Sequence, residues 1–310
     1  MKEKVILREV GLRDGLQMVA QVLSTERKLT WIQTEAEAGV REIEVTSFVP
    51  PAVIPQFADA VAVSQGSEGI AGLTRAALVP NLKGAQRGFD MGLEKINFVV
   101  SASETHNQAN VRRTSAESVE EFRRIVAERD ARGLRGKVAL GCGVATSFGC
   151  TLQGDVPETA VLGIFEALLD AGADEVGLAD TVGYANPAQV ARLFKAALKI
   201  AQDRPVTAHF HDTRGLGIAN LLTALEVGIR RFDASLAGLG GCPFAPGATG
   251  NVTYEDCAFL LETEGFETGV DFDKLFALRR MVETWLDGET FMGGVYRAGL
   301  PKTFGNISAA

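Results

Sequence analysis

The sequence predicts a (β/α)8 barrel, an α/β fold in which eight parallel strands alternate with helices around a closed sheet. Eight short apolar runs rich in β-branched residues recur along the chain, and amphipathic stretches of helical period separate them. The repeats are evenly spaced over about 265 residues, the usual size of such a barrel. A doubly wound open sheet is the runner-up, but even spacing of eight units favours closure.

Each expected strand is short and ends near polar residues or glycine. In chain order the strands are VILREVG (5–11), EIEVTSF (42–48), TRAALVPN (74–81), KINFVVSAS (95–103), KVALGCGVATS (137–147), EVGLADTVG (175–183), PVTAHFHD (205–212) and RFDASLAGLG (231–240). The clearest helices between them are 115–133, 157–173 and 187–202. Gly133 ends the first of these segments and Gly172 lies one residue before the end of the second, and glycine is the expected stop signal.

No Pro-, Ser- or charge-rich linker divides the chain, so residues 1–310 are expected to form a single catalytic barrel domain. Residues 265–310 are expected to form a helical or irregular C-terminal extension, with a helix at 271–286.

Composition excludes several classes of protein. Hydrophobic residues make up 46% of the chain, and the net charge of −8 argues against nucleic-acid binding, which needs a basic face. No apolar run is long enough to span a bilayer, and the N-terminus lacks the features of a signal or transit peptide, so a cytoplasmic protein is expected. The four cysteines form no CxxC pair and are expected to be free thiols.

Polar residues gather where the predicted strands end, which in a barrel of this type is the rim that carries active sites. A structural barrel would scatter them over both rims. The residues are Arg13, Asp14, Glu44, Ser47, Asn81, Ser101, Ser103, Asp180, Thr181, His209 and His211.

The stretch AHFHDTRGLGIAN contains two of the three histidines of the chain. On a strand, His209 and His211 face the same side, so they can bind one divalent metal ion or simply hydrogen-bond in a polar barrel mouth. Asp14 follows the first strand, which closes next to the eighth, and Asn251 offers an oxygen. Such mixed N/O ligation suits Mg²⁺, Mn²⁺, Zn²⁺ or Co²⁺.

The stretch AGLGGCPFAPGATGN (237–251) has five glycines and a single cysteine, Cys242. This composition predicts a loop that can close over a ligand, in which a thiol could transfer a proton. The alternative is a rigid turn in which the cysteine has no role.

In five stretches the chain resembles the 3-hydroxy-3-methylglutaryl-CoA lyase family of metal-dependent barrel lyases. These are EVGLRDGLQ (9–17), EVTSFV (44–49), VPNLKG (79–84), AHFHDTRGLGIAN (208–220) and SLAGLGGCPFAPGATGN (235–251). The resemblance implies retro-Claisen cleavage of a 3-hydroxyacyl-CoA to acetyl-CoA and a keto acid, acetoacetate in the parent family. It also implies a homodimer.

The resemblance implies roles for particular residues. Asp14, His209, His211 and Asn251 would hold a divalent metal, Mg²⁺ or Mn²⁺ in the first place. His209, or a group that it orients, would take the hydroxyl proton. Arg13 would stabilise the enolate, and Cys242 would protonate it. Asp180 and Glu44 would support the metal or the hydroxyl, while the expected contacts to the acyl-CoA are Gln17, Asn81, Lys83, Ser101, Arg112 and Arg113.

The chain also departs from the family pattern. The family usually has an arginine on strand five, near Gly141, and reads GCPYEG where this chain has GCTLQG (149–154). Where a lysine is common after TSFV, the run is PPAVIPQ (50–56). Citramalyl-CoA, cleaved to acetyl-CoA and pyruvate, or a bulkier 3-hydroxyglutaryl-CoA is therefore an alternative substrate.

Two other classes of function are weaker fits. A condensing synthase of the isopropylmalate or homocitrate type would read GERxGN in place of the Cys242 loop, and many carry a long regulatory domain. A ligand-binding barrel without catalysis is disfavoured because reactive residues occupy all the matched positions.

Overall fold

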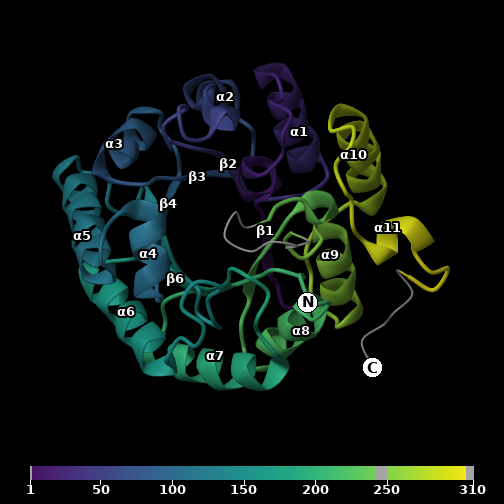
Figure 1. Ribbon diagram of the computed structural model, residues 1–310. Coiled ribbons are helices and arrows are strands. Elements are labelled where there is room, and N and C mark those ends of the chain that lie inside the picture. Colours follow the sequence, from purple (N-terminus) through teal and green to yellow (C-terminus); the bar gives the residue numbers. More distant parts are fainter. Residues whose placement is uncertain (1, 242–249, 305–310) are drawn as a thin grey trace.

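The protein folds as a closed parallel barrel ringed by helices, seen along the barrel axis in Figure 1 of the computed structural model. The structure describes residues 2–241 and 250–304. The strands pair in sequence order, and β8 closes on β1 with Leu7 beside Phe232. The predicted (β/α)8 fold is confirmed.

The strands are short, and all their pairings are parallel. They are β1 (Ile6–Glu9), β2 (Glu42–Ser47), β3 (Thr74–Leu78), β4 (Lys95–Ser101), β5 (Ala139–Ala145), β6 (Glu175–Asp180), β7 (Val206–Phe210) and β8 (Arg231–Ala234). The helices are α1 (Thr25–Glu37), α2 (Ala60–Gly66), α3 (Leu82–Asp90), α4 (Glu104–Val111), α5 (Ser115–Ala131), α6 (Glu158–Ala171), α7 (Pro187–Ala201), α8 (Gly217–Glu226), α9 (Tyr254–Thr263), α10 (Phe272–Trp285) and α11 (Gly294–Ala298). Short turns of helix are η1 (Gly11–Gly15), η2 (Pro55–Phe57) and η3 (Leu236–Gly238).

All eight strands end earlier than predicted, by one to six residues, and at β1 and β8 the chain turns there toward the barrel mouth. Strand one was predicted over 5–11, but η1 begins at Gly11. Strand eight was predicted over 231–240, but β8 ends at Ala234 and Ala237 adopts a left-handed conformation with φ of 59°. Apolar composition continues past both ends, so hydrophobicity alone could not locate them.

Local sequence explains where the helices start and stop. Thr114 and Glu117 form a reciprocal capping box at the start of α5. Asn186 caps α7, which has Pro187 in its first turn. Gly172 ends α6 in the left-handed region, with φ of 105°.

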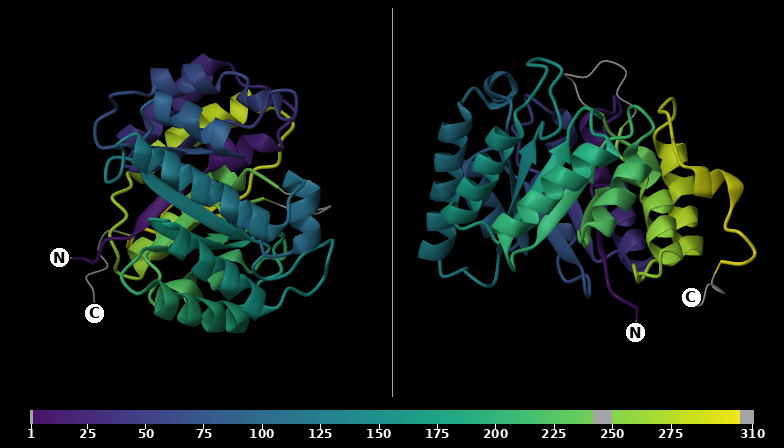
Figure 2. Two further views of the ribbon diagram at one scale, coloured as in Figure 1. Left: turned by 90° about the vertical axis from the view of Figure 1, so that its left-hand side faces the viewer. Right: turned by 90° about the horizontal axis from the view of Figure 1, so that it is seen from below.

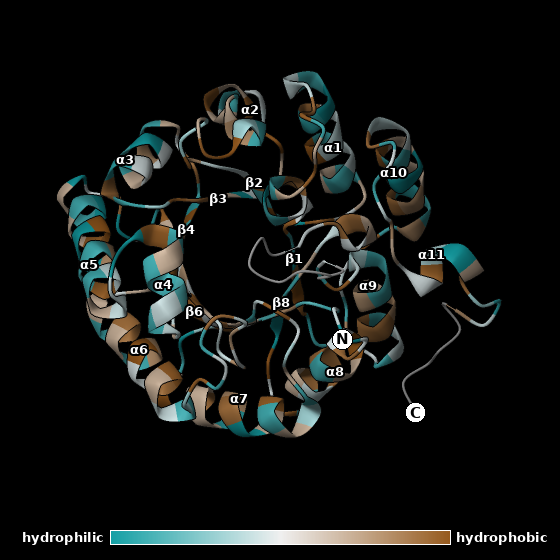
Figure 3. Cartoon of the chain, in the orientation of Figure 1, coloured by the Kyte–Doolittle hydropathy of each residue, from teal (hydrophilic) through white to brown (hydrophobic). Residues whose placement is uncertain are grey.

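The hydrophobic core lies between the strands and the surrounding helices. Large side chains such as Phe122, Phe165 and Phe194 are fully buried there. Figure 3 shows hydrophobic colouring on the inner faces of several helices and hydrophilic colouring on outer ones. Among the described residues, no helix is both long and apolar enough to cross a membrane.

Helices α10 and α11 follow the last barrel helix, and Figures 1 and 2 show them outside the ring at one side of the barrel. Asp271 caps the start of α10, and α10 packs against α1. The predicted helix at 271–286 is thus present as Phe272–Trp285.

The floor of the barrel is an ionic layer rather than an apolar one. Lys95 donates to Glu42 at 2.7 Å and to Glu175 at 2.8 Å, and Arg231 pairs with the same two carboxylates. Burial alone would raise the pKa of Glu175, but Lys95, Arg231 and Arg8 lower it to about 2. Charge compensation therefore keeps this buried layer ionised.

A second buried acidic group lies behind β1. Burial raises the pKa of Glu9 to about 8, and it raises the pKa of Glu35 well above its ordinary value. Glu35 Oε1 accepts a hydrogen bond of 2.6 Å from Trp31, while its Oε2 is buried without a partner among the described residues. Such surroundings favour the protonated form of Glu35.

Candidate metal centre and active site

A cavity of about 410 Å³ opens among the carboxyl ends of the barrel strands. This is the end at which such barrels carry their active sites. Its lining includes the residues that the sequence analysis placed at the centre of the site: Arg13, Asp14, Glu44, His209 and His211.

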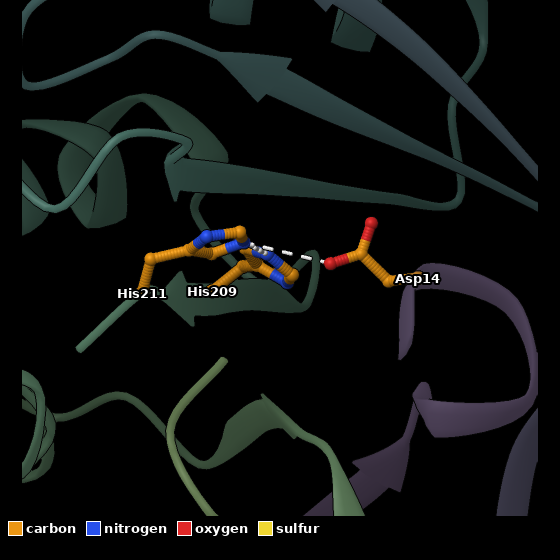
Figure 4. A group of neighbouring side chains, drawn as sticks. All are labelled: Asp14, His209 and His211. Carbon is orange, nitrogen blue, oxygen red and sulfur yellow. Dashed lines mark hydrogen bonds and ion pairs between the residues drawn. The ribbon is translucent and has the colours of Figure 1, made fainter. Parts of the chain in front are cut away.

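Asp14, His209 and His211 point toward one another, as Figure 4 shows. One ligand atom from each lies within 4.8 Å of the others. His211 Nε2 is 3.5 Å from Asp14 Oδ2 and 3.1 Å from His209 Nε2. The first and seventh strands, distant in sequence, therefore bring a carboxylate and two imidazoles within reach of one cation.

The backbone at η1 positions Asp14. The N–H groups of Arg13, Asp14 and Gly15 all donate to the carbonyl oxygen of Val10, at 3.1, 2.7 and 3.2 Å. This tight turn follows β1 directly, so Asp14 projects over the barrel mouth. It is the turn that the GLRDG sequence forms in place of further strand.

Asn251 is the fourth candidate metal ligand, beside Asp14, His209 and His211. Its Nδ2 donates to Asp14 Oδ2 at 2.7 Å, and its backbone bridges to His211. Asn251 Oδ1 is buried and has no hydrogen-bond partner among the described residues. Because buried polar atoms nearly always have a partner, this oxygen is suited to coordinate a cation held by the same residues.

The electrostatics also fit a divalent cation. Burial alone would raise the pKa of Asp14, but Arg13, His211 and His209 hold it well below its usual range. An ionised carboxylate, two imidazoles and an amide oxygen are a ligand set suited to Mg²⁺, Mn²⁺, Zn²⁺ or Co²⁺.

Arg13 joins the two acidic residues of the site. Its Nε donates to Glu44, and its Nη1 donates to Asp14 Oδ1 at 2.6 Å. Glu44 also accepts a 2.8 Å hydrogen bond from Asn97. A guanidinium fixed in this way beside the candidate metal ligands can stabilise an oxyanion without reorganising.

Sequence reasoning missed a supporting pair, Asp233 and Arg8. Asp233 Oδ2 lies 3.1 Å from His209 Nδ1, and Arg8 donates two hydrogen bonds of 2.8 Å to the same carboxylate. If Nδ1 carries the proton, Nε2 of His209 is free to bind a cation. Both residues point inward on strands β8 and β1, a signal available in the alternation of those strands.

The other predicted residues fall into two groups. Gln17, Asn81 and Arg113 line the cavity. Lys83 and Arg112 are exposed and lie outside its lining.

Ser101 and Asp180 are engaged in the scaffold. The Ser101 hydroxyl is hydrogen-bonded to the His106 ring at 2.6 Å. Asp180 accepts backbone hydrogen bonds from Tyr184 and Ala185 at 2.8 and 3.1 Å, so its carboxylate holds the loop after β6. Cys242 lies outside the described residues, whereas Cys142, Cys150 and Cys257 are buried and free.

The fold and site define a class of protein: (β/α)8 enzymes with a His₂–carboxylate cluster at the barrel mouth. The HMGL-like family model matches residues 4–282, and the chain belongs to this family of carbon–carbon lyases. It is 41% identical to a hydroxymethylglutaryl-CoA lyase of Bacillus subtilis over 91% of this chain and 93% of that protein. It is also 41% identical to the (R)-citramalyl-CoA lyase of Chloroflexus aurantiacus, over 89% of each. Among solved structures, an HMG-CoA lyase of Acinetobacter baumannii, in complex with coenzyme A and 3-methylmalate, superposes with a TM-score of 0.90, 41% identity and 96% coverage of each chain.

Proposed function

We propose that the protein cleaves a 3-hydroxyacyl-CoA of the 3-hydroxy-3-methylglutaryl-CoA type to acetyl-CoA and a keto acid. The observation that carries this proposal is Arg13, a largely buried guanidinium held beside the cluster of Asp14, His209 and His211. A retro-Claisen cleavage releases an enolate, which is a poor leaving group unless a cation meets its charge. Family membership supports the same reaction.

In this proposal Asp14, His209, His211 and Asn251 would hold a divalent cation, with Mg²⁺ or Mn²⁺ as the first choice and Zn²⁺ or Co²⁺ as alternatives. When bound, the cation would supply a Lewis acid that holds a carbinol hydroxyl and a carboxylate oxygen of the substrate and makes the hydroxyl easier to deprotonate.

The protein residues then divide the work of the reaction. A group that His209 orients, or His209 itself when its Nε2 does not hold the cation, accepts the hydroxyl proton, and Asp233 fixes the His209 ring. The electron pair of the O–H bond forms the new carbonyl at C3, and the C2–C3 bond breaks with its electron pair passing to C2, the carbon α to the thioester carbonyl. Arg13 stabilises the resulting enolate by charge and hydrogen bonding. We propose that Cys242 returns a proton to that carbon, giving acetyl-CoA.

Gly141 bears on which acyl group is cleaved. A Cβ atom at this position would lie 2.5 Å from Asn97 Oδ1 and 3.2 Å from the Lys95 side chain. Asn97 and Lys95 thus occupy the space that the first side-chain atoms of an arginine at position 141, as expected in the family, would need. Our second candidate substrate is citramalyl-CoA, which would give pyruvate as the keto acid. The similarity to an (R)-citramalyl-CoA lyase supports this choice.

One panel tests the proposal: 3-hydroxy-3-methylglutaryl-CoA and both citramalyl-CoA enantiomers, each with Mg²⁺ or Mn²⁺, followed by acetyl-CoA release. We expect release from at least one substrate and its loss on chelation. Arg13→Met should lower kcat by about 10²–10³, and Cys242→Ala should lower turnover by a similar order with the fold intact. Arg192→Met, at an exposed surface pair, is the matched control for Arg13→Met.

The alternative outcomes are distinct. Net consumption of an acyl-CoA with a 2-oxo acid would indicate a condensing synthase instead. Tight binding of the thioesters with no product would indicate a barrel without catalysis. We also propose a homodimer, which light scattering of the purified protein would test.

A further inference from the structure

Three inward-facing glycines on the neighbouring strands β5 and β6 raise the question of what each leaves room for. Two are explained by packing. A Cβ at Gly141 would meet Asn97 Oδ1 at 2.5 Å, and one at Gly177 would lie 3.1 Å from the carbonyl oxygen of Thr207. Both glycines therefore allow a neighbouring group to approach closely.

Gly143 is different. A Cβ there would touch a single described side-chain atom, Val99 Cγ2, at 3.8 Å, and the backbone φ of Gly143 is not positive. The position lines the cavity and is partly exposed to it, whereas its neighbours Cys142 and Val144 are buried. No described protein group fills the space that this glycine leaves.

We call the open space at Gly143, together with the cavity wall around it, the recess. Ala145, on the same strand, and Ala179, on β6, are the small side chains beside it, and Leu78 and Val99 add apolar lining. In such barrels the interior is normally filled by layers of branched side chains. Here the cavity-lining positions Gly143 and Ala145 on β5 and Gly177 and Ala179 on β6 carry no branched side chain. In an eight-stranded barrel β5 lies across from β1. Gly143 on β5 therefore lies across the barrel mouth from Arg13 and Asp14, which directly follow β1.

The charges of the cavity indicate what the recess can hold. Its lining arginines are each paired with a carboxylate: Arg8 with Asp233, Arg13 with Asp14 and Arg113 with Glu121. A further carboxylate placed in the recess would find no unpaired arginine among the described lining residues. An apolar group, in contrast, would cover apolar wall and lose water contact favourably.

We infer that the recess at Gly143 receives an uncharged apolar substituent, larger than methyl, on the carbinol carbon of the substrate. Gly143 is then a specificity-determining residue, and the preferred substrates are 3-hydroxyacyl-CoA thioesters with an extended alkyl or alkenyl branch at C3. This inference rests on the proposed function, because it places the carbinol carbon beside Asp14 and His209.

The test compares kcat/KM for 3-hydroxy-3-methylglutaryl-CoA and for its 3-butyl homologue. We expect the wild-type protein to favour the butyl substrate by about 10-fold or more, since each added methylene in an apolar pocket is worth about 10–200-fold. Gly143→Val should lower kcat/KM for the butyl substrate by about 100-fold and for the methyl substrate by less than about 3-fold. Gly143→Ala should give a smaller change in the same direction.

Gly163→Val is the matched control, because a Cβ at that α6 position would meet no described atom within 4 Å. It should leave the preference unchanged. Cleavage of the methyl substrate alone by the wild type, or an equal loss of both activities in Gly143→Val and in Gly143→Ala, would overturn the inference and leave the proposed function standing. Failure to cleave these two substrates and both citramalyl-CoA enantiomers would contradict the proposed function itself. Thermal melting of each variant shows that it is folded.

Discussion

Replacing Asp233 with asparagine probes how the protein holds His209. The native carboxylate accepts from His209 Nδ1 at 3.1 Å and takes two 2.8 Å hydrogen bonds from Arg8. Asparagine has the same shape but one acceptor oxygen and one NH₂ group, so a donor must face either Arg8 or His209. Loss of a group that orients a metal-binding imidazole costs about 10–100-fold in metal affinity, equivalent to about 1.4–2.7 kcal/mol.

Calorimetric titration of purified Asp233→Asn with Mn²⁺ measures this effect directly. We expect Kd to rise by about 10–100-fold while one ion per chain still binds. Asp174→Asn is the matched control: Asp174 accepts from Arg129 at 2.6 Å and from the backbone of Leu140 at 2.7 Å, and it does not line the cavity. Equal Mn²⁺ affinity in Asp233→Asn and the wild type would refute the argument that Asp233 orients His209.

Two further predictions concern stability and the loop before Asn251. The pKa of Glu35 is raised in the folded protein, so folding takes up a proton that the unfolded chain releases above about pH 4.5; the free energy of unfolding should fall as pH rises from about 5 to 8. Glu35→Gln should remove up to about 1.4 kcal/mol per pH unit of that decline. Urea unfolding of both proteins at pH 5 and pH 8 measures it. An equal fall in the free energy of unfolding of the wild type and of Glu35→Gln would be inconsistent with a protonated Glu35. Gly250→Ala should weaken Mn²⁺ binding more than tenfold, because Gly250 has φ of 94° and an added Cβ would lie 2.2 Å from the Gly238 carbonyl oxygen, displacing Asn251. Calorimetry measures that change, and an unaltered Kd would show that Asn251 does not depend on this turn.

The parts of the fold that could be predicted from sequence are those set by short-range patterns. Alternating apolar runs and helix caps indicate eight strand–helix units, and they indicate that His209 and His211 share a face. Asp14 could be placed beside them because β1 adjoins β8 in a closed barrel. These inferences need only strand order and the alternation of side chains.

Other features depend on distances across the barrel, which one sequence does not reveal. The pairing of Asp233 with Arg8, the Asn97 side chain in front of Gly141 and the open space at Gly143 arise from packing between separate strands. Lys83 and Arg112 were expected to contact the acyl-CoA because they follow strands three and four, yet they lie outside the cavity lining. A position at a strand end indicates the rim but not the direction of a long side chain.

The central claim is that strands one and seven supply ligands to a single cation at Asp14, His209 and His211. Anomalous diffraction from crystals grown with Mn²⁺ tests it most directly. We predict one strong peak about 2.0–2.3 Å from a carboxylate oxygen of Asp14 and from an imidazole nitrogen of each histidine. That peak should be absent in Asp14→Ala. A Mn²⁺ peak elsewhere in the wild type, or the same peak undiminished in Asp14→Ala, would contradict the claim.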